Sequence, residues 1–316
     1  MLEYIIKRIL SIIPILIVVS LMVFFLIHLT PGDPAAVILG PAATITALEN
    51  LRAEMGLDMP FHEQLMTWFS NVIRGDLGNS LFMKKTVLEA FMDHLGPTLS
   101  LAIMGQMIAI LISIPVGIIA ANNRGSNIDR AVSIFSTLGI SIPNFLLALF
   151  LVLIFSVALS LFPVAGYRPL SAGLWPHIRY LTLPAVTLGI IQAALLTRVT
   201  RSSMLEVLNN NYIKTAYSKG LSEWAVIIKH AFRNAFIPIL TAIGQSFAQL
   251  VVGAIVVETV FNIPGIGQLL INAISRRDFQ VIQGAILLIA TTFIIINLVI
   301  DLLYGLLDPR VRLNRK

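Results

Sequence analysis

The sequence predicts an all-α integral membrane protein with six core transmembrane helices and both termini in the cytoplasm. Of its 316 residues, 57% are hydrophobic and only 12% are charged, whereas soluble domains carry about 25% charged residues. The mean hydropathy is +0.88. The apolar residues gather in long segments, and a helix needs about 20 such residues to cross a hydrocarbon core of roughly 30 Å. These observations exclude an ordinary soluble domain.

Six segments are long enough to span a membrane. In chain order they are Ile9–Leu29, Leu99–Ala121, Ala131–Leu161, Leu181–Val199, Phe236–Val257 and Val281–Leu307. The first is too long for a signal peptide and has no small-residue cleavage site, so we expect it to remain as a span. The third contains Pro143, which we expect to kink it. The fourth is the most polar, with Thr182, Pro184, Thr187 and Gln192.

The distribution of lysine and arginine sets the predicted orientation. With both termini inside, the inner segments hold 14 of these residues and the outer segments hold 8, although the outer loops contain more residues. This bias follows the positive-inside rule. Orientation in the membrane therefore explains the net charge of +6 better than nucleic-acid binding does. The chain has no cysteine, which excludes disulfides, thiolate nucleophiles and Cys-ligated metal sites.

We expect a single transmembrane domain over residues 1–316. Its one sizeable extracytoplasmic part is the loop 30–96, which opens with TPGDPA and continues with a pattern typical of short amphipathic helices. This loop is too small for a large core of its own, so we expect it to pack on the outer ends of the spans. Residues 204–235 form a cytoplasmic segment between the fourth and fifth spans.

The catalytic motifs that we considered are incomplete or absent in this sequence. HEQLM, His62–Met66, begins like a zinc-protease helix but has methionine in place of the second histidine. GxSxG and GxxxxGK[ST] are absent, so the chain has neither a serine elbow nor its own phosphate-binding loop. We therefore expect no catalytic, cofactor-binding or metal-ligating residues here, and an energy source that lies on other subunits.

The centres of the spans carry uncharged polar residues rather than the ionisable residues typical of pumps and ion-coupled carriers. Such side chains commonly bridge neighbouring helices. They could instead line a wetted path for a polar solute, and the sequence leaves both interpretations open. The candidates for a path are Gln106, Ser141, Asn144, Gln192, Gln245 and Gln249.

The cytoplasmic segment predicts a short helix that is not stable by itself. Asn209–Asn211 favour a break, Tyr212–Lys219 predicts a helix, Gly220 suits the left-handed position that ends it, and Ser222 can cap the next helix. One face of the short helix is expected to hold Tyr212, Ile213, Ala216 and Tyr217. Isolated helices need roughly 12–15 residues, so this one must pack on its own spans or dock in a groove of another protein.

The run YIKTAYSKGLSEWAVIIKHAFRNAFIP, Tyr212–Pro238, resembles the signature loop of ATP-binding-cassette importer permeases of the peptide/nickel branch. Further motifs of that branch follow the family order: LTPGDPA, GDLGNS, TRSSMLEVL, VETVFNIPGIGQLL, RRDFQVIQG and NLVIDLLYGLLDPRVR. The resemblance implies the type I importer permease fold. It also implies ATPase coupling through Tyr212, Ala216, Tyr217, Lys219, Gly220, Leu221, His230, Arg233, Asn234 and Pro238. The general motif begins Glu-Ala-Ala, whereas this chain has Lys214-Thr215-Ala216, so no acidic contact is expected there.

The resemblance also implies an assembly in a prokaryotic cell membrane. A second homologous permease, two cytoplasmic ATPase subunits that bind ATP and Mg, and an extracytoplasmic solute-binding protein would complete it. This chain would form half of a translocation path for di- or oligopeptides, with nickel, metal chelates or glutathione as alternative substrates. A stand-alone secondary carrier or channel and a membrane-anchored scaffold are the other classes of function that we weigh.

Overall fold

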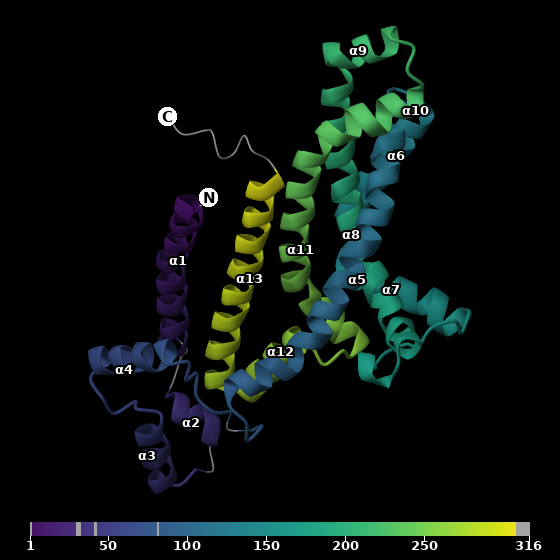
Figure 1. The fold of residues 1–316 in the computed structure, drawn as a ribbon. Coiled ribbons are helices and arrows are strands. Elements are labelled where there is room, and N and C mark those ends of the chain that lie inside the picture. Colours follow the sequence, from purple (N-terminus) through teal and green to yellow (C-terminus); the bar gives the residue numbers. More distant parts are fainter. Residues whose placement is uncertain (1, 30–32, 41–42, 81, 308–316) are drawn as a thin grey trace. The chain divides into compact units, whose positions relative to one another are not determined.

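The computed structural model describes residues 2–29, 33–40, 43–80 and 82–307. Nearly all of this backbone is helical (Figure 1). The chain divides into two compact units: unit 1 comprises Met1–Gly96 and Pro264–Ile295, and unit 2 comprises Pro97–Ile263 and Ile296–Lys316. Each unit is described by itself. Residues 30–32 of the LTPGDPA motif and residues 308–312 of the last motif lie outside the described residues.

Unit 1 contains the first apolar helix and the loop 30–96. Its helices are α1 (Leu2–Leu29), α2 (Pro34–Leu39), α3 (Ile45–Glu54), α4 (Phe61–Ile73) and α12 (Ile266–Arg276), with the first turns of α5 (Val87–Asn122) and most of α13 (Phe279–Leu307). The three short helices α2, α3 and α4 occupy the loop 30–96, as its sequence pattern predicts. Asp33 begins α2 because its carboxylate accepts a hydrogen bond from the Ala35 backbone N–H at 3.1 Å.

The loop of unit 1 packs on α1 and on the start of α13. The Phe24 ring of α1 lies 5.6 Å from the ring of Phe61 and 5.7 Å from that of Trp68, both on α4. At α13, the Ser80 hydroxyl donates to the buried Asp278 carboxylate at 2.6 Å. Aromatic contacts and a buried polar pair therefore hold the loop on these two helices, as expected.

Unit 2 contains the remaining helices. They are α6 (Asn127–Ser141), α7 (Asn144–Leu151), the π-helix η1 (Val152–Ala158), the short η2 (Leu170–Ala172), α8 (Leu174–Leu208), α9 (Asn211–Ser218), α10 (Glu223–Ala225), the π-helix η3 (Val226–Phe232) and α11 (Arg233–Phe261), with the rest of α5 and α13. Of the most apolar 18-residue stretch of α8, 61% is buried, against 33–39% in the other three long helices. The most polar predicted span is therefore the most buried of these four helices within the chain.

Small residues allow α5 and α8 to approach closely. A Cβ atom on Gly189 of α8 would lie 2.8 Å from a methyl group of Ile108 on α5. On α5, a Cβ atom on Gly117 would lie 2.6 Å from the Thr200 side chain of α8. Close backbone contact through glycines is typical of helix packing in membranes.

Four of the described helices are individually long and apolar enough to cross a membrane: α5, α8, the continuous helix Glu223–Phe261, and α13. The described apolar part of α1, Leu10–Phe25, is shorter. All six predicted segments coincide with helices, but the described residues support four or five spans, so the number six stays a prediction. The orientation of the termini also stays a prediction.

The third predicted span is broken rather than kinked. α6 and the helix Asn144–Ala158 meet at an angle of 104°. Ile142 has extended backbone angles (φ −81°, ψ 124°) because a residue that precedes proline is disfavoured in the helical region. Pro143 then starts the next helix. The sequence predicts the position of the break correctly. The bend between the two helices is larger than the expected kink, so the pair is one strongly bent span or a re-entrant loop.

Candidate functional site

The predicted coupling segment forms a separate short helix at one end of unit 2 (Figure 1). α8 ends at Leu208 and α9 begins at Asn211, so the break expected at Asn209–Asn211 is confirmed. Gly220 has φ +76°, the left-handed conformation expected at the end of this helix. Within the described residues, no atom lies within 4 Å of the position that a Gly220 Cβ would take. The backbone angle, and not lack of space, therefore requires glycine here.

α9 has one buried side and one exposed side. Ile213 and Ala216 are buried in a hydrophobic cluster with Met204 of α8 and with Val226 and Ala231 of η3. The side chains of Tyr212, Tyr217 and Leu221 are exposed by 42%, 44% and 41%. At 3.6 residues per turn, the four predicted residues span an arc of about 140° on the helix, with the buried Ile213 and Ala216 in its middle and the partly exposed tyrosines at its two edges. The helix packs on its own chain and still presents an aromatic surface.

The segment after Gly220 joins the fifth span without interruption. Ser222 lies at the N-cap of α10, but its side chain makes no capping hydrogen bond. From Glu223 the helix continues through η3 and α11 to Phe261, a length of 39 residues. The π-helical turn of η3 was not expected, because VIIKHAF contains no glycine or proline that would signal it. Single π-turns are frequent at functional sites.

Asn234 connects α9 to α11. Its side-chain Nδ2 donates to the Tyr212 hydroxyl at 2.9 Å and to the His230 carbonyl at 3.0 Å. The structure thus brings together three of the predicted coupling residues. Arg233 and Pro238 are exposed on the same helix, and Lys219 is the C-cap residue of α9. The ATPase contacts of these residues stay a prediction.

The same end of unit 2 holds an ion pair that the sequence analysis missed. The Arg201 guanidinium of α8 binds the Asp129 carboxylate of α6 through both Nε and Nη2, with an Nη2–Oδ2 distance of 2.9 Å. Asp129 also accepts a hydrogen bond from the Gly125 N–H at 2.9 Å. Asp129 and Arg201 are 72 residues apart, so no local pattern signals that they meet.

The six predicted pathway residues do not share one environment. Gln106 is buried, and its Oε1 accepts a hydrogen bond from Ser246 at 2.9 Å, which bridges α5 and α11. Gln245 and Gln249 are exposed on one face of α11 because they are four residues apart. The others are the half-buried Gln192 and Asn144 and the exposed Ser141, whose hydroxyl donates to the Thr137 carbonyl. Gln106 thus bridges helices, while Gln245 and Gln249 stay available to line a path.

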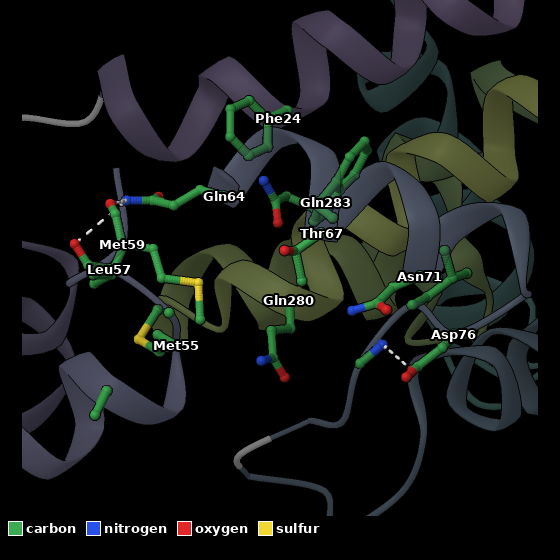
Figure 2. A pocket seen from close by; sticks show the side chains of 15 residues that line it. Phe24, Met55, Leu57, Met59, Gln64, Thr67, Asn71, Asp76, Gln280 and Gln283 are labelled. Atoms are coloured by element: carbon green, nitrogen blue, oxygen red, sulfur yellow. Dashed lines mark hydrogen bonds between the residues drawn. The ribbon is translucent and has the colours of Figure 1, made fainter. Parts of the chain in front are cut away.

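A cavity of about 290 Å³ lies in unit 1, and none of the predicted pathway residues lines it (Figure 2). Thr67, Gln280 and Gln283 point toward its interior, with Met55 and Met59 on one side. Gln64 closes the rim by donating to the Met59 carbonyl at 2.8 Å. The lining combines hydroxyl and carboxamide groups with thioethers and one carboxylate, that of Asp76. These residues are far apart in the sequence, so no motif indicated the cavity.

Known proteins resemble the chain over almost its whole length. Residues 113–313 match the family model described as binding-protein-dependent transport system inner membrane component, and residues 1–102 match the model for the N-terminal part of such components. A probable peptide ABC transporter permease of Sinorhizobium fredii is 42% identical over 98% of this chain and 99% of that protein. A glutathione transport system permease of Shigella flexneri is 43% identical over 99% of both chains.

A solved structure also matches the fold. A chain of the inward-facing MetNI methionine ABC transporter superposes with a TM-score of 0.58 and 16% sequence identity. The match covers 69% of this chain and 96% of the other. At this level of identity the similarity concerns the fold alone.

Proposed function

Because the chain belongs to the family of binding-protein-dependent transport system inner membrane components, we propose that it forms one half of the translocation path of an ATP-driven peptide importer. It is a multi-pass protein of the cell membrane. The proposed partners are a second homologous permease, two cytoplasmic ATPase subunits that bind ATP and Mg, and an extracytoplasmic solute-binding protein. The lipid bilayer surrounds the assembly, and no nucleic acid takes part.

The exposed side of α9 is the observation that best supports ATPase coupling. A two-turn helix is ordered here because Ile213 and Ala216 are buried against its own chain. Tyr212, Tyr217 and Leu221 remain exposed, and an aromatic helical surface of this kind suits a groove on another protein. The two alternatives left open by the sequence are thus compatible: one side packs on the chain and the other docks.

A displacement of α9 would be transmitted to α11 by the chain itself and by a hydrogen bond. Asn234 joins α9 to the base of α11 through Tyr212, and the helix Glu223–Phe261 is continuous. Closure of the ATPase subunits on ATP would displace α9, and the displacement would carry α11 with it. Alternating access then follows if the two permeases rock between outward-open and inward-open states.

The proposed substrates are di- or oligopeptides. Two relatives that cover this chain almost completely are named for peptide and for glutathione transport, and glutathione is itself a tripeptide. Uncharged groups such as Gln245 and Gln249 on the exposed face of α11 suit a path for zwitterionic or neutral solutes, because they neither bind nor repel a charge strongly. Nickel and metal chelates are the alternative substrates of the same architecture.

The test is uptake into proteoliposomes that contain the two permeases, with and without the ATPase subunits and the binding protein. We expect uptake of a labelled dipeptide only with the full set and ATP. Uptake without the ATPases would indicate a secondary carrier or channel, and the absence of substrate-stimulated ATP hydrolysis would indicate a scaffold. Parallel assays with glutathione and Ni²⁺ distinguish the substrate classes.

A further inference from the structure

A second cavity, of about 140 Å³, lies between α6 and α8 in unit 2. Val132, Ser136 and Ile140 of α6 line it on one side, and Thr197, Arg198 and Arg201 of α8 line it on the other. These residues lie at the end of unit 2 that carries the coupling segment, since α8 reaches Leu208 two turns beyond Arg201. In the predicted topology this end is the cytoplasmic membrane interface.

Two buried hydroxyl groups of this cavity have no hydrogen-bond partner in the described part of the chain. They belong to Ser136, which is 4% exposed, and Thr197, which is 0% exposed. Neighbouring hydroxyls behave differently: Ser133 donates to the Asp129 carbonyl at 2.8 Å, and Thr137 donates to the Ser133 carbonyl at 2.9 Å. Buried polar groups are nearly always paired in native proteins. The Ser113 and Thr200 hydroxyls are also unpaired among the described residues but do not line this cavity, so it is the position of Ser136 and Thr197 beside the cavity and its arginines that points to a bound group that accepts hydrogen bonds.

The cavity also has a strong positive charge at its edge. Asp129 holds the Arg201 guanidinium in place through Nε and Nη2, so the Nη1 donors take no part in this ion pair. Arg198 is exposed three residues earlier on the same helix. Arg198 and Arg201 thus place two positive charges at the cavity, against the single buried carboxylate of Asp129, and the local field favours an anion.

The surface beside the cavity is apolar. Ile134, Leu138 and Ile140 on α6 are exposed by 60%, 57% and 43%, and both α6 and α8 belong to candidate spans. A ligand that combines a phosphate-like group with hydrocarbon fits this juxtaposition better than a free ion does. Basic pockets between helices on the cytoplasmic side are suited to anionic lipid headgroups.

We propose that this cavity binds the phosphate of an anionic phospholipid in the cytoplasmic leaflet. Arg198 and Arg201 supply charge-assisted hydrogen bonds to phosphate oxygens, and the Ser136 and Thr197 hydroxyls supply two further donors. The acyl chains lie along the exposed apolar side of α6. The proposal depends on the predicted topology and is independent of the transported solute.

The test is lipid retention measured by native mass spectrometry on the intact transporter complex, equilibrated with phosphatidylglycerol or phosphatidylcholine. We expect selective retention of phosphatidylglycerol. The double variant Arg198→Gln/Ser136→Ala should weaken retention about tenfold or more, as loss of a charged contact and a hydroxyl donor implies. Arg201 is left intact, because its removal would leave the buried Asp129 unpaired.

The matched control is Arg130→Gln, which removes a positive charge at the same end of α6 but outside the cavity lining. It should retain phosphatidylglycerol like the unchanged protein. Equal retention of the two lipids, or equal loss in the control and in the double variant, would overturn the proposal. Displacement by inorganic phosphate without any lipid preference would assign the cavity to a free anion and would also overturn it.

Discussion

The side chains of Asn234 and Tyr212 form a 2.9 Å hydrogen bond between the start of α11 and the start of α9. These residues are 22 positions apart, and Gly220 and the π-helix η3 lie between them. The bond closes a loop around the hydrophobic cluster that holds Ile213 and Ala216. The first residues of α9 are therefore linked to α11 by this hydrogen bond, and the last residues of α9 are linked to α11 by the chain itself.

Removal of this hydrogen bond should lower the amount of peptide transported per ATP hydrolysed, whereas the free energy of unfolding should change little. Tyr212→Phe keeps the ring and removes only the hydroxyl, at a cost of about 1 kcal/mol or less because the bond is exposed. We expect several-fold less peptide taken up per ATP hydrolysed in proteoliposomes. Ser218→Ala is the control, since it removes an exposed hydroxyl of the same helix that donates to the Lys214 carbonyl within α9; an equal effect of both changes would contradict the role of the Asn234 bond.

The effect of a substitution at Gly220 should depend on how readily the new residue adopts a positive φ, and not on the size of its side chain. At φ +76° a β-branched side chain is strained by about 1–2 kcal/mol or more, whereas asparagine adopts this conformation more readily. We expect Gly220→Val to reduce co-purification of the ATPase subunits and uptake, and Gly220→Asn to retain most of both. Because the site is open, equal loss in both variants would indicate a steric contact with a partner instead.

The two sides of α9 should respond differently to truncation. Ile213 is buried, so Ile213→Ala should destabilise this segment by about 2–5 kcal/mol and lower the melting temperature of the purified protein. Tyr217→Ala should leave the melting temperature nearly unchanged and weaken ATPase binding. Thermal unfolding and subunit co-purification measure the two effects, and similar profiles for the two variants would argue against a division into packing and docking sides.

The Ser80–Asp278 pair should stabilise the loop 30–96 of unit 1. Ser80→Ala removes a 2.6 Å hydrogen bond to a buried carboxylate and should destabilise the loop by about 1–3 kcal/mol. Faster hydrogen exchange at residues 77–87 and in the first turn of α13 is the expected readout. Ser275→Ala, which removes an exposed hydroxyl bonded within its own helix, should leave this exchange unchanged.

The sequence allows the helical fold to be predicted because long apolar segments have few alternatives in a membrane. It also allows the turn at Gly220 and the break at Asn209–Asn211 to be predicted, because these residue types act locally. The 104° bend at Pro143 exceeds the expected kink, since the angle depends on packing around the break. The η3 π-turn, the Asp129–Arg201 pair and both cavities depend on residues that meet only in three dimensions.

The most direct test of the central claim is a crosslink between α9 and an ATPase subunit. The chain has no cysteine, so Tyr217→Cys introduces a single thiol on the exposed side of α9, and Trp175→Cys provides a control at the other end of α8, where the native side chain is more exposed (73% against 44%). We predict that only the Tyr217→Cys thiol crosslinks to a cysteine placed in the ATPase groove, and that the crosslink blocks ATP-driven uptake until it is reduced. Full uptake with α9 crosslinked, or ATP-independent uptake by the permeases alone, would contradict the account.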